Sequence, residues 1–258
     1  MVDFQPVERI AGPAEAGVLI LCDHASNALP AAYGSLGLPP EAFGRHIAFD
    51  IGAAGVARRL AALLKAPAVL SCFSRLLIDP NRGADDPTLV MRISDGALIP
   101  GNARIDQAEI DRRIANYWRP YRAAAAAELE RMSASGVVPA IVSIHSFTPA
   151  WKGVARPWHV ALLWDCDQRL SRPLIDALGA ERDLVVGDNE PYDGALAGDT
   201  MFELGTARGL PHALVEIRQD LIADEKGWIE WAGRLARELA PILAEPGLHR
   251  VEMHATRT

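Results

Sequence analysis

Short apolar runs alternate with longer amphipathic stretches along most of this chain. Six of the runs are continuously apolar, which is typical of strands that are buried on both faces. The predicted strands are Gly17–Cys22, Pro67–Cys72, Pro139–His145, Trp158–Trp164, Asp183–Gly187 and Ala213–Ile217. Helical stretches are predicted between them, at 52–65, 106–133, 171–179, 199–208 and 225–243. This alternation predicts one α/β domain over residues 1–258, with a parallel or mixed sheet and helices on both faces.

The longest predicted helix begins with a capping box and contains a proline in its interior. Asp106 and Glu109 have the spacing of a capping box, which satisfies backbone N–H groups at a helix N-terminus. Pro120 lies inside the same stretch and has no N–H to donate to the helix. We therefore expect a kink near Pro120.

The composition fits a soluble globular protein. The chain has 258 residues, of which 50% are hydrophobic and 23% are charged, and its net charge is −7. This acidic balance disfavours nucleic acid and anionic membrane surfaces as partners, because both attract basic patches. The N-terminus does not resemble a signal peptide, and no apolar run reaches the ~20 residues of a membrane span. We expect a cytoplasmic protein whose composition is compatible with a homo-oligomer but does not require one.

Polar and ionisable residues follow four of the predicted strands. Asp23 and His24 come directly after the first strand, His145 ends the third, and Glu216 lies near the end of the last. The second strand leads to the segment 79–82, with the sequence Asp-Pro-Asn-Arg. Because open α/β sheets bind ligands at the carboxyl ends of their strands, we expect these residues to meet at one edge of the sheet.

These residue types suit metal-assisted hydrolysis. His24 and His145 could supply two imidazole nitrogens to one metal ion, with zinc as the first candidate. The oxygen donors from which a third ligand could come are Asn27, Asp23 and Asp50. A divalent metal is therefore the cofactor that the pattern indicates.

A general base and a carboxylate-binding pair complete this interpretation. A metal-activated water needs a carboxylate that is not itself a ligand, and Glu216 fits that role. Arg82 with Asn81 suits a substrate carboxylate, because the guanidinium fork binds carboxylates through two hydrogen bonds. The chain contains no G-x-S-x-G nucleophile elbow, no G-x-G-x-x-G loop and no phosphate-binding G-x-x-x-x-G-K-[ST] loop.

Six segments together resemble the N-formylglutamate amidohydrolase family. They are, in order, CDHASNALP, RHIAFDIGA, SRLLIDPNR, SIHSFTP, GDNEPY and VEIRQDLI, and the similarity extends from about residue 17 to residue 222. That family is similar in turn to the zinc carboxypeptidases and aspartoacylases. The resemblance implies a three-layer α/β/α sandwich with a mixed, mostly parallel sheet, like that of the zinc carboxypeptidases and the phosphorylase/hydrolase-like folds.

The resemblance also implies roles for individual residues. In these relatives an early His-x-x-Glu and a later His hold zinc, an Asn-Arg pair binds the substrate carboxylate, and a late Glu is the general base. The same order appears here as His24, Asn81-Arg82, His145 and Glu216. Asn27 stands where the relatives have the glutamate, and Asp50 matches an aspartate of the family pattern, so the third ligand is expected from Asn27 or Asp50. One divalent metal is implied, with zinc first and cobalt or manganese as alternatives.

The expected reaction is hydrolysis of the formyl or acyl amide of an N-formyl amino acid. N-formyl-L-glutamate is the first candidate substrate, and formate and L-glutamate are the products. The residues expected to bind this small molecule are Asn81, Arg82, Arg75, Arg218, Arg156 and Tyr192.

Two alternatives remain at this stage. The first is a metallo-amidase or carboxypeptidase-like enzyme that acts on a peptide or a cell-wall fragment. The second is a non-catalytic member that binds a small carboxylate. Asn27 favours the second alternative, whereas His24, His145 and Glu216 together argue against it.

Overall fold

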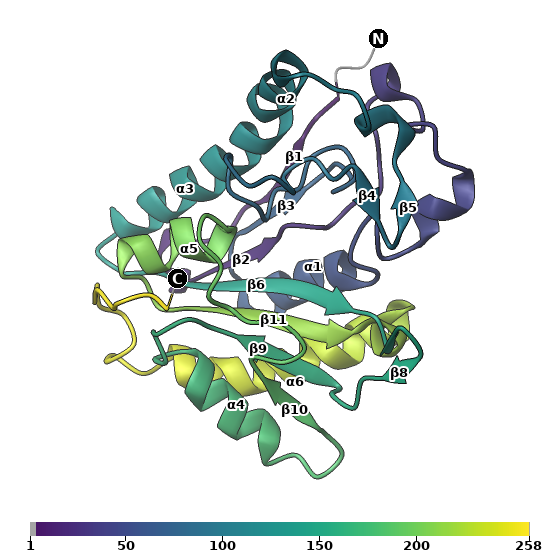
Figure 1. The fold of residues 1–258 in the computed structure, drawn as a ribbon. Coiled ribbons are helices and arrows are strands. Elements are labelled where there is room, and N and C mark those ends of the chain that lie inside the picture. The colour runs from purple at the N-terminus through teal and green to yellow at the C-terminus, as the bar shows by residue number, and fades with distance from the viewer. Residues whose placement is uncertain (1–3, 258) are drawn as a thin grey trace.

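A seven-stranded sheet forms the centre of the computed structural model, which describes residues 4–257 (Figure 1). Neighbouring strands are parallel except in the pairs β1–β3 and β9–β11, which confirms the predicted mixed and mostly parallel sheet. Across the sheet the strands are β1 (Val7–Ile10), β3 (Ala68–Ser71), β2 (Val18–Cys22), β6 (Ala140–Phe147), β11 (His212–Arg218), β9 (Val160–Leu163) and β10 (Val186–Asp188). All six apolar runs of the sequence form strands of this sheet.

Helices cover both faces of the sheet, so the three-layer α/β/α arrangement is confirmed (Figure 1). Alternate residues of each central strand pack against opposite layers: Val142 and Ile144 of β6 belong to one core cluster, and Ile141 belongs to the other. The helices on the first face are α1 (Ala53–Leu64), α4 (Ser171–Gly179) and α6 (Glu225–Leu243). Those on the second face are α3 (Arg119–Ser133) and α5 (Thr200–Leu204).

The long helical stretch predicted at 106–133 contains a π-helical turn. It consists of α2 (Gln107–Arg113), a π-helical segment (Ile114–Trp118) and α3. The Asp106 carboxylate accepts a hydrogen bond from the Glu109 N–H at 2.9 Å, which confirms the predicted N-cap. Pro120 follows the π-helical segment directly after Arg119, and a proline leaves the carbonyl four residues earlier without its usual partner. The sequence predicts a kink near Pro120, and the structure has a π-helical segment directly before this position.

Two small hairpins and several 3-10 segments complete the elements. The hairpins are β4 (Ile93–Ser94) with β5 (Ala97–Leu98), and β7 (Ala150–Trp151) with β8 (Val154–Ala155). The 3-10 segments are Ala14–Ala16, Ala31–Tyr33, Pro40–Gly44, Pro100–Asn102, Thr206–Arg208 and Gln219–Ile222. Within residues 4–257, no helix has the length and apolarity that crossing a bilayer requires.

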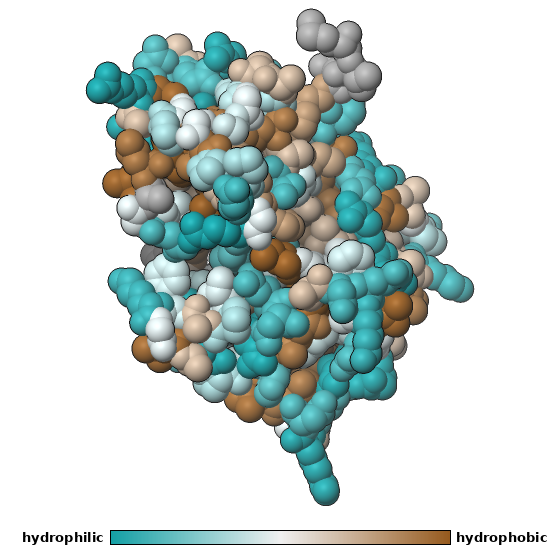
Figure 2. Space-filling view, turned by 90° about the vertical axis from the view of Figure 1, so that its right-hand side faces the viewer, coloured by the Kyte–Doolittle hydropathy of each residue, from teal (hydrophilic) through white to brown (hydrophobic). Residues whose placement is uncertain are grey.

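Both hairpins lie on the side of the molecule toward which the arrowheads of β6 and β11 point (Figure 1). Figure 2 looks onto this side, where hydrophilic and hydrophobic residues are interspersed. The carboxyl ends of the central parallel strands therefore face this part of the surface.

Candidate active site

The central strands bring the predicted site residues to one edge of the sheet. His24 follows β2 by two residues, and β2 is the parallel neighbour of β6, which contains His145. Glu216 of β11 lies directly opposite His145 in the parallel register of β11 and β6. Sheet pairing alone therefore places the second histidine and the glutamate side by side.

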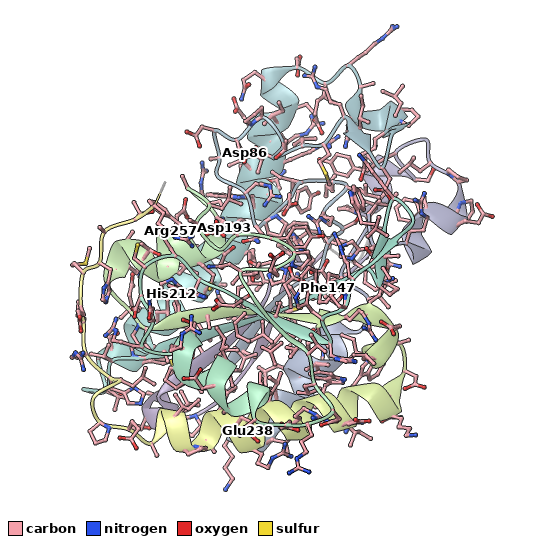
Figure 3. All side chains as sticks on the ribbon, turned by 60° about the horizontal axis from the view of Figure 1, so that its bottom comes forward. Asp86, Phe147, Asp193, His212, Glu238 and Arg257 are labelled. Atoms are coloured by element: carbon pink, nitrogen blue, oxygen red, sulfur yellow. The ribbon has the colours of Figure 1, made fainter. Side chains whose placement is uncertain are left out.

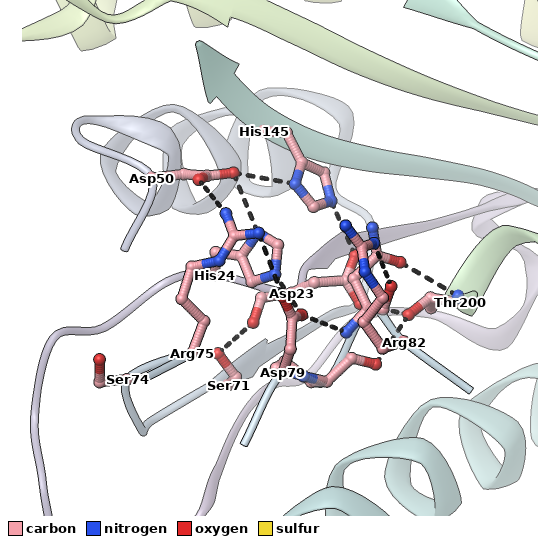
Figure 4. A network of polar contacts seen from close by, with 12 residues as sticks. Asp23, His24, Asp50, Ser71, Ser74, Arg75, Asp79, Arg82, His145 and Thr200 are labelled. Carbon is pink, nitrogen blue, oxygen red and sulfur yellow. Dashed lines mark hydrogen bonds and ion pairs between the residues drawn. The ribbon is translucent and has the colours of Figure 1, made fainter. Parts of the chain in front are cut away.

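A buried His–Asp–His cluster occupies this edge (Figure 4). The Nδ1 atoms of His24 and His145 lie 3.2 Å and 2.9 Å from the same oxygen of Asp50, its Oδ2. Asp50 comes from the loop before α1, and its backbone N–H donates to the His24 carbonyl at 3.0 Å, which holds this loop against the end of β2. One donor atom from each of the three residues lies within 4.8 Å of the others, so the cluster could hold a metal ion.

Each of the two imidazole rings contacts a second carboxylate through its Nε2 atom. The Nε2 atom of His24 is 2.7 Å from Asp79, and the Nε2 atom of His145 is 2.9 Å from Asp23 (Figure 4). Such carboxylates orient metal-binding histidines, because a proton held on Nε2 leaves the lone pair of Nδ1 for the metal. Two Nδ1 atoms and one carboxylate oxygen form a donor set that zinc and similar divalent ions accept.

Asp23 is surrounded by hydrogen-bond donors. Its carboxylate accepts from the hydroxyl groups of Ser143, Tyr121 and Thr200 at 2.8, 3.1 and 2.6 Å, in addition to the bond with His145. Burial by itself would raise the pKa of Asp23, but the hydrogen bond from His145 and the charges of the histidines outweigh it and hold this pKa far below the usual range. Asp23 is therefore a carboxylate anion that already accepts hydrogen bonds from four side chains.

The charges around His145 make its metal binding dependent on pH. Burial would lower the pKa of His145, but its hydrogen bonds to Asp23 and Asp50 raise that pKa well above the usual value. Without a bound cation the ring is therefore protonated near neutral pH. A metal ion has to displace a proton from this ring, so metal affinity falls as the pH is lowered.

Glu216 is a buried carboxylate with an unused acceptor. Its exposed fraction is 6%, and its Oε2 atom has no hydrogen-bond partner among the residues that the structure describes. Burial raises the pKa of Glu216 to about 7, with the charge of His145 acting in the opposite direction. A carboxylate of this pKa can accept and release a proton near neutral pH, which a general base and acid must do.

A cavity of about 210 Å³ opens beside the cluster. It is lined by the His–Asp–His cluster, Glu216, Asn81 and Arg82, together with residues of the segment 192–201. Arg82 donates to the Asn81 carbonyl at 3.0 Å, and its nearest carboxylate, Asp86, is 4.0 Å away. Asn81 accepts a hydrogen bond from the backbone N–H of Thr200 at 3.1 Å. The predicted carboxylate-binding pair therefore adjoins the cavity.

Arg75 lines the cavity but is engaged with the cluster. Its guanidinium donates to Asp50 at 3.3 Å and to Asp79 at 3.1 Å (Figure 4). This arrangement neutralises part of the acidic charge around His24. Arg75 thus supports the cluster from its place in the cavity lining.

Arg156 and Tyr192 lie together at the side of the site. The Arg156 guanidinium stacks over the rings of Phe147, Trp151 and Tyr192, at 5.8, 5.8 and 5.2 Å from their centroids. Its Nη2 donates to the Tyr192 hydroxyl at 3.3 Å, and Tyr192 lines the cavity. Tyr192 therefore lines the cavity, and Arg156 contacts the ring and the hydroxyl group of Tyr192.

Asn27 and Arg218 point away from the cluster. Asn27 is exposed, and its amide donates to the Phe43 carbonyl at 2.7 Å. The Arg218 guanidinium pairs with both carboxylate oxygens of Asp220 at 2.8 and 3.2 Å and donates to the Trp158 carbonyl. Asp50 and not Asn27 completes the set of converging donors.

Three further residues contribute to the site without a role predicted from the sequence. Asp79 precedes the Asn-Arg pair in the SRLLIDPNR segment, and this position is the only signal that the sequence gives for it. His46 lines the cavity with its Nδ1 atom 3.5 Å from Asp50, and burial lowers the pKa of His46 to about 4. Asp199 caps α5 and lines the cavity, and burial raises its pKa to about 7.

The fold and the converging donors define a three-layer α/β protein with a candidate metal centre. The family model for N-formylglutamate amidohydrolase matches residues 16–223. The chain therefore belongs to the N-formylglutamate amidohydrolase family, a family of amidohydrolases.

Solved structures agree with this assignment of the fold. A gene product of Agrobacterium tumefaciens is 32% identical to this chain with a TM-score of 0.87, and the match covers 93% of this chain and 96% of that one. N-formylglutamate amidohydrolase from Ralstonia eutropha is 22% identical with a TM-score of 0.70, and the match covers 92% and 97% of the two chains. The second likeness concerns the fold alone. No curated protein matches the sequence significantly.

Proposed function

We propose that this protein is a metal-dependent amidohydrolase that cleaves the formyl or acyl amide of an N-formyl amino acid. N-formyl-L-glutamate is the reference substrate, because the family takes its name from it. The observation that carries the proposal is the buried carboxylate of Glu216, which lies beside the His–Asp–His cluster and whose Oε2 atom has no hydrogen-bond partner within residues 4–257. A structural glutamate in this position would be expected to use both of its oxygens.

His24, Asp50 and His145 would hold the divalent ion, with zinc as the first candidate and cobalt or manganese as alternatives. When bound, the ion would supply Lewis-acid polarisation of the amide carbonyl and would lower the pKa of a water molecule. Asp79 and Asp23 keep the two imidazole rings oriented.

Glu216 performs the proton transfers in this mechanism. Its carboxylate takes a proton from the attacking water, whose oxygen forms a bond to the amide carbon. The same group then delivers the proton to the nitrogen as the C–N bond breaks. For a formyl amide the products are formate and the free amino acid, and Glu216 returns to its starting state.

Arg82 and Asn81 bind the α-carboxylate of the substrate. Arg82 is only 28% exposed and has no carboxylate of the described part of the chain closer than 4.0 Å, so much of its guanidinium fork is available to a ligand. Tyr192 lines the same cavity, and Arg156, which is not among the lining residues, donates to the Tyr192 hydroxyl.

The test measures metal content and turnover on one sample. Elemental analysis is done on protein purified without a chelator or a metal-affinity tag, and formate release from N-formyl amino acids is followed before and after chelation. We expect one divalent ion per chain and activity that chelation removes and added metal restores. Protein that takes up no zinc, cobalt or manganese would overturn the proposal, as would turnover that chelators leave unchanged.

A further inference from the structure

The cavity continues past Glu216 along β11. Residues two apart on a strand share a face, so Glu216, Leu214 and His212 form one row, and all three line the cavity. Leu163 of β9 is the register partner of Leu214 and lines the cavity beside it. Figure 3 shows His212 and Phe147 near opposite ends of the central strands, with Asp193 in a loop above the sheet.

Apolar side chains close this extension from above. Met201 of α5 packs in the same core cluster as Leu163 and Leu214, and Leu196 of the preceding loop also lines the cavity. Leu163, Leu214 and Met201 are 4–5% exposed, so their surfaces toward the cavity are nearly shielded from solvent. We call the part of the cavity lined by Leu163, Leu196, Met201 and Leu214 the apolar arm.

The far end of the row on β11 offers no free polar group to a ligand. The His212 Nδ1 atom is 2.8 Å from the Leu210 carbonyl, and its Nε2 atom is 3.2 Å from the Thr206 hydroxyl. Both ring nitrogens are therefore occupied by the protein itself. The His212 ring therefore ends the apolar arm with both of its nitrogens already hydrogen-bonded to the protein.

The charges of the cavity favour a substrate with one carboxylate. Among the described residues that line it, the arginines are Arg75 and Arg82, and Arg75 is paired with Asp50 and Asp79. Arg82 lies 4.0 Å from its nearest carboxylate among the described residues, so it is the lining arginine without a close ion pair. Asp193 and Asp199 also line the cavity, but Asp193 pairs with Arg257, and neither residue supplies a cation for a second carboxylate.

The carboxylate-binding pair and the apolar arm adjoin each other. The Asn81 side chain accepts from the backbone N–H of Thr200, and Met201 is the next residue along the chain. An amino acid held at Arg82 by its α-carboxylate therefore has its side chain within reach of Met201 and Leu214. A γ-carboxylate placed there would lose its hydration without gaining a cation.

From this geometry we infer that the apolar arm is a side-chain pocket, and that the preferred substrates are N-formyl amino acids with an uncharged, apolar side chain of about the size of leucine or methionine. This inference rests on the proposed function and narrows its substrate class. The competing arrangement would direct the γ-carboxylate of glutamate to Arg156 beside Tyr192. Arg156 has no ion pair with a carboxylate in residues 4–257, so this arrangement has to be tested directly.

The first experiment compares kcat/KM for formate release from the N-formyl derivatives of L-leucine, L-methionine, L-glutamate and L-lysine, using the metal-loaded full chain. We expect leucine and methionine to exceed glutamate and lysine at least tenfold. A glutamate or lysine derivative that equals or exceeds leucine would overturn the side-chain pocket and leave the proposed function intact. Failure to release formate from all four would overturn both.

A second experiment places a cation in the apolar arm. Met201→Arg should shift the ratio of kcat/KM values for glutamate and leucine toward glutamate at least tenfold, because the new guanidinium can pair with the γ-carboxylate. Leu63→Arg is the matched control, since Leu63 is 56% exposed on α1, and it should leave the ratio unchanged. Loss of a pre-existing glutamate preference in Arg156→Gln would instead support the competing arrangement at Arg156.

Discussion

At Glu216, burial and the nearby histidines act in opposite directions on one carboxylate. Burial favours the protonated acid, whereas the positive charge of His145 favours the anion, and burial prevails to place the pKa at about 7. A solvent-exposed glutamate would be ionised throughout the neutral range and would be a weaker base. The position of Glu216 therefore supplies the proton affinity that its proposed role needs.

Replacing Glu216 by Gln should lower kcat about 10²- to 10⁴-fold, because general-base catalysis contributes factors of this size. Metal content should not change, since Glu216 is not among the converging donors. In the wild type, kcat/KM should rise with pH up to about pH 7 as the Glu216 proton is lost, and any residual activity of the variant should lack this rise. Elemental analysis and pH–rate profiles check both statements, and a variant that retains wild-type kcat would exclude Glu216 as the base.

Individual residues were predictable from the sequence where a strand leads directly to them. His24, His145 and Glu216 belong to this group, because each lies at or just after the end of an apolar run. For the third donor, the sequence left the choice between Asn27 and Asp50, because local periodicity does not determine the path of a loop. Asn27 is closer to His24 in sequence, but its segment turns toward Phe43, whereas the loop with Asp50 returns to the His24 backbone.

At the scale of elements, the buried strands were the most predictable part of the fold. Their residues are apolar on both faces because both faces are covered, and this leaves a continuous signal in the sequence. The edge strand β1 was missed. It spans four residues, none of them fully buried, and it pairs antiparallel with β3 alone. The short hairpins give still weaker patterns.

Asp79 shows how a connecting segment contributes to the candidate metal centre. Asp79→Asn should reduce metal affinity about 10- to 100-fold, because the carboxylate that orients His24 would become a neutral amide. Asp85→Asn in the same segment is the control, since Asp85 is exposed. Competition with a chromogenic chelator measures both affinities, and equal affinities in the two variants would show that Asp79 does not support the site.

At the scale of the whole molecule, acidic charge is concentrated where a cation would bind. Asp23, Asp50 and Asp79 are each at most 2% exposed. Burial alone would raise their pKa values, but the hydrogen bond from His145 lowers the pKa of Asp23 most, and the charge of His24 lowers those of Asp50 and Asp79 most, so the pKa values of all three lie below the usual range. A bound divalent ion would compensate part of this negative charge. The folded state should therefore be stabilised by the metal, since the unfolded chain does not assemble the donors.

The melting temperature should accordingly depend on metal. At a free metal concentration about 1,000 times the Kd, the stabilisation is about 4 kcal/mol, which for a chain of this size raises Tm by about 10 °C. Differential scanning fluorimetry with chelator and with added zinc measures the difference. His145→Ala should show little or no metal-dependent rise, and an unchanged wild-type Tm would contradict binding at the His–Asp–His cluster.

The register pairing of Glu216 with His145 has a consequence for how this enzyme could diversify. Backbone hydrogen bonds of two central strands set the separation of these residues, so the reacting groups depend on the most constrained part of the chain. The apolar arm is completed by Leu196 and Met201, which belong to a loop and a five-residue helix. The proposed chemistry therefore resides on the central strands, whereas half of the apolar arm lies on connecting segments outside the sheet. Relatives that exchange the segment 188–204 could inherit the same reaction and direct it at a different metabolite.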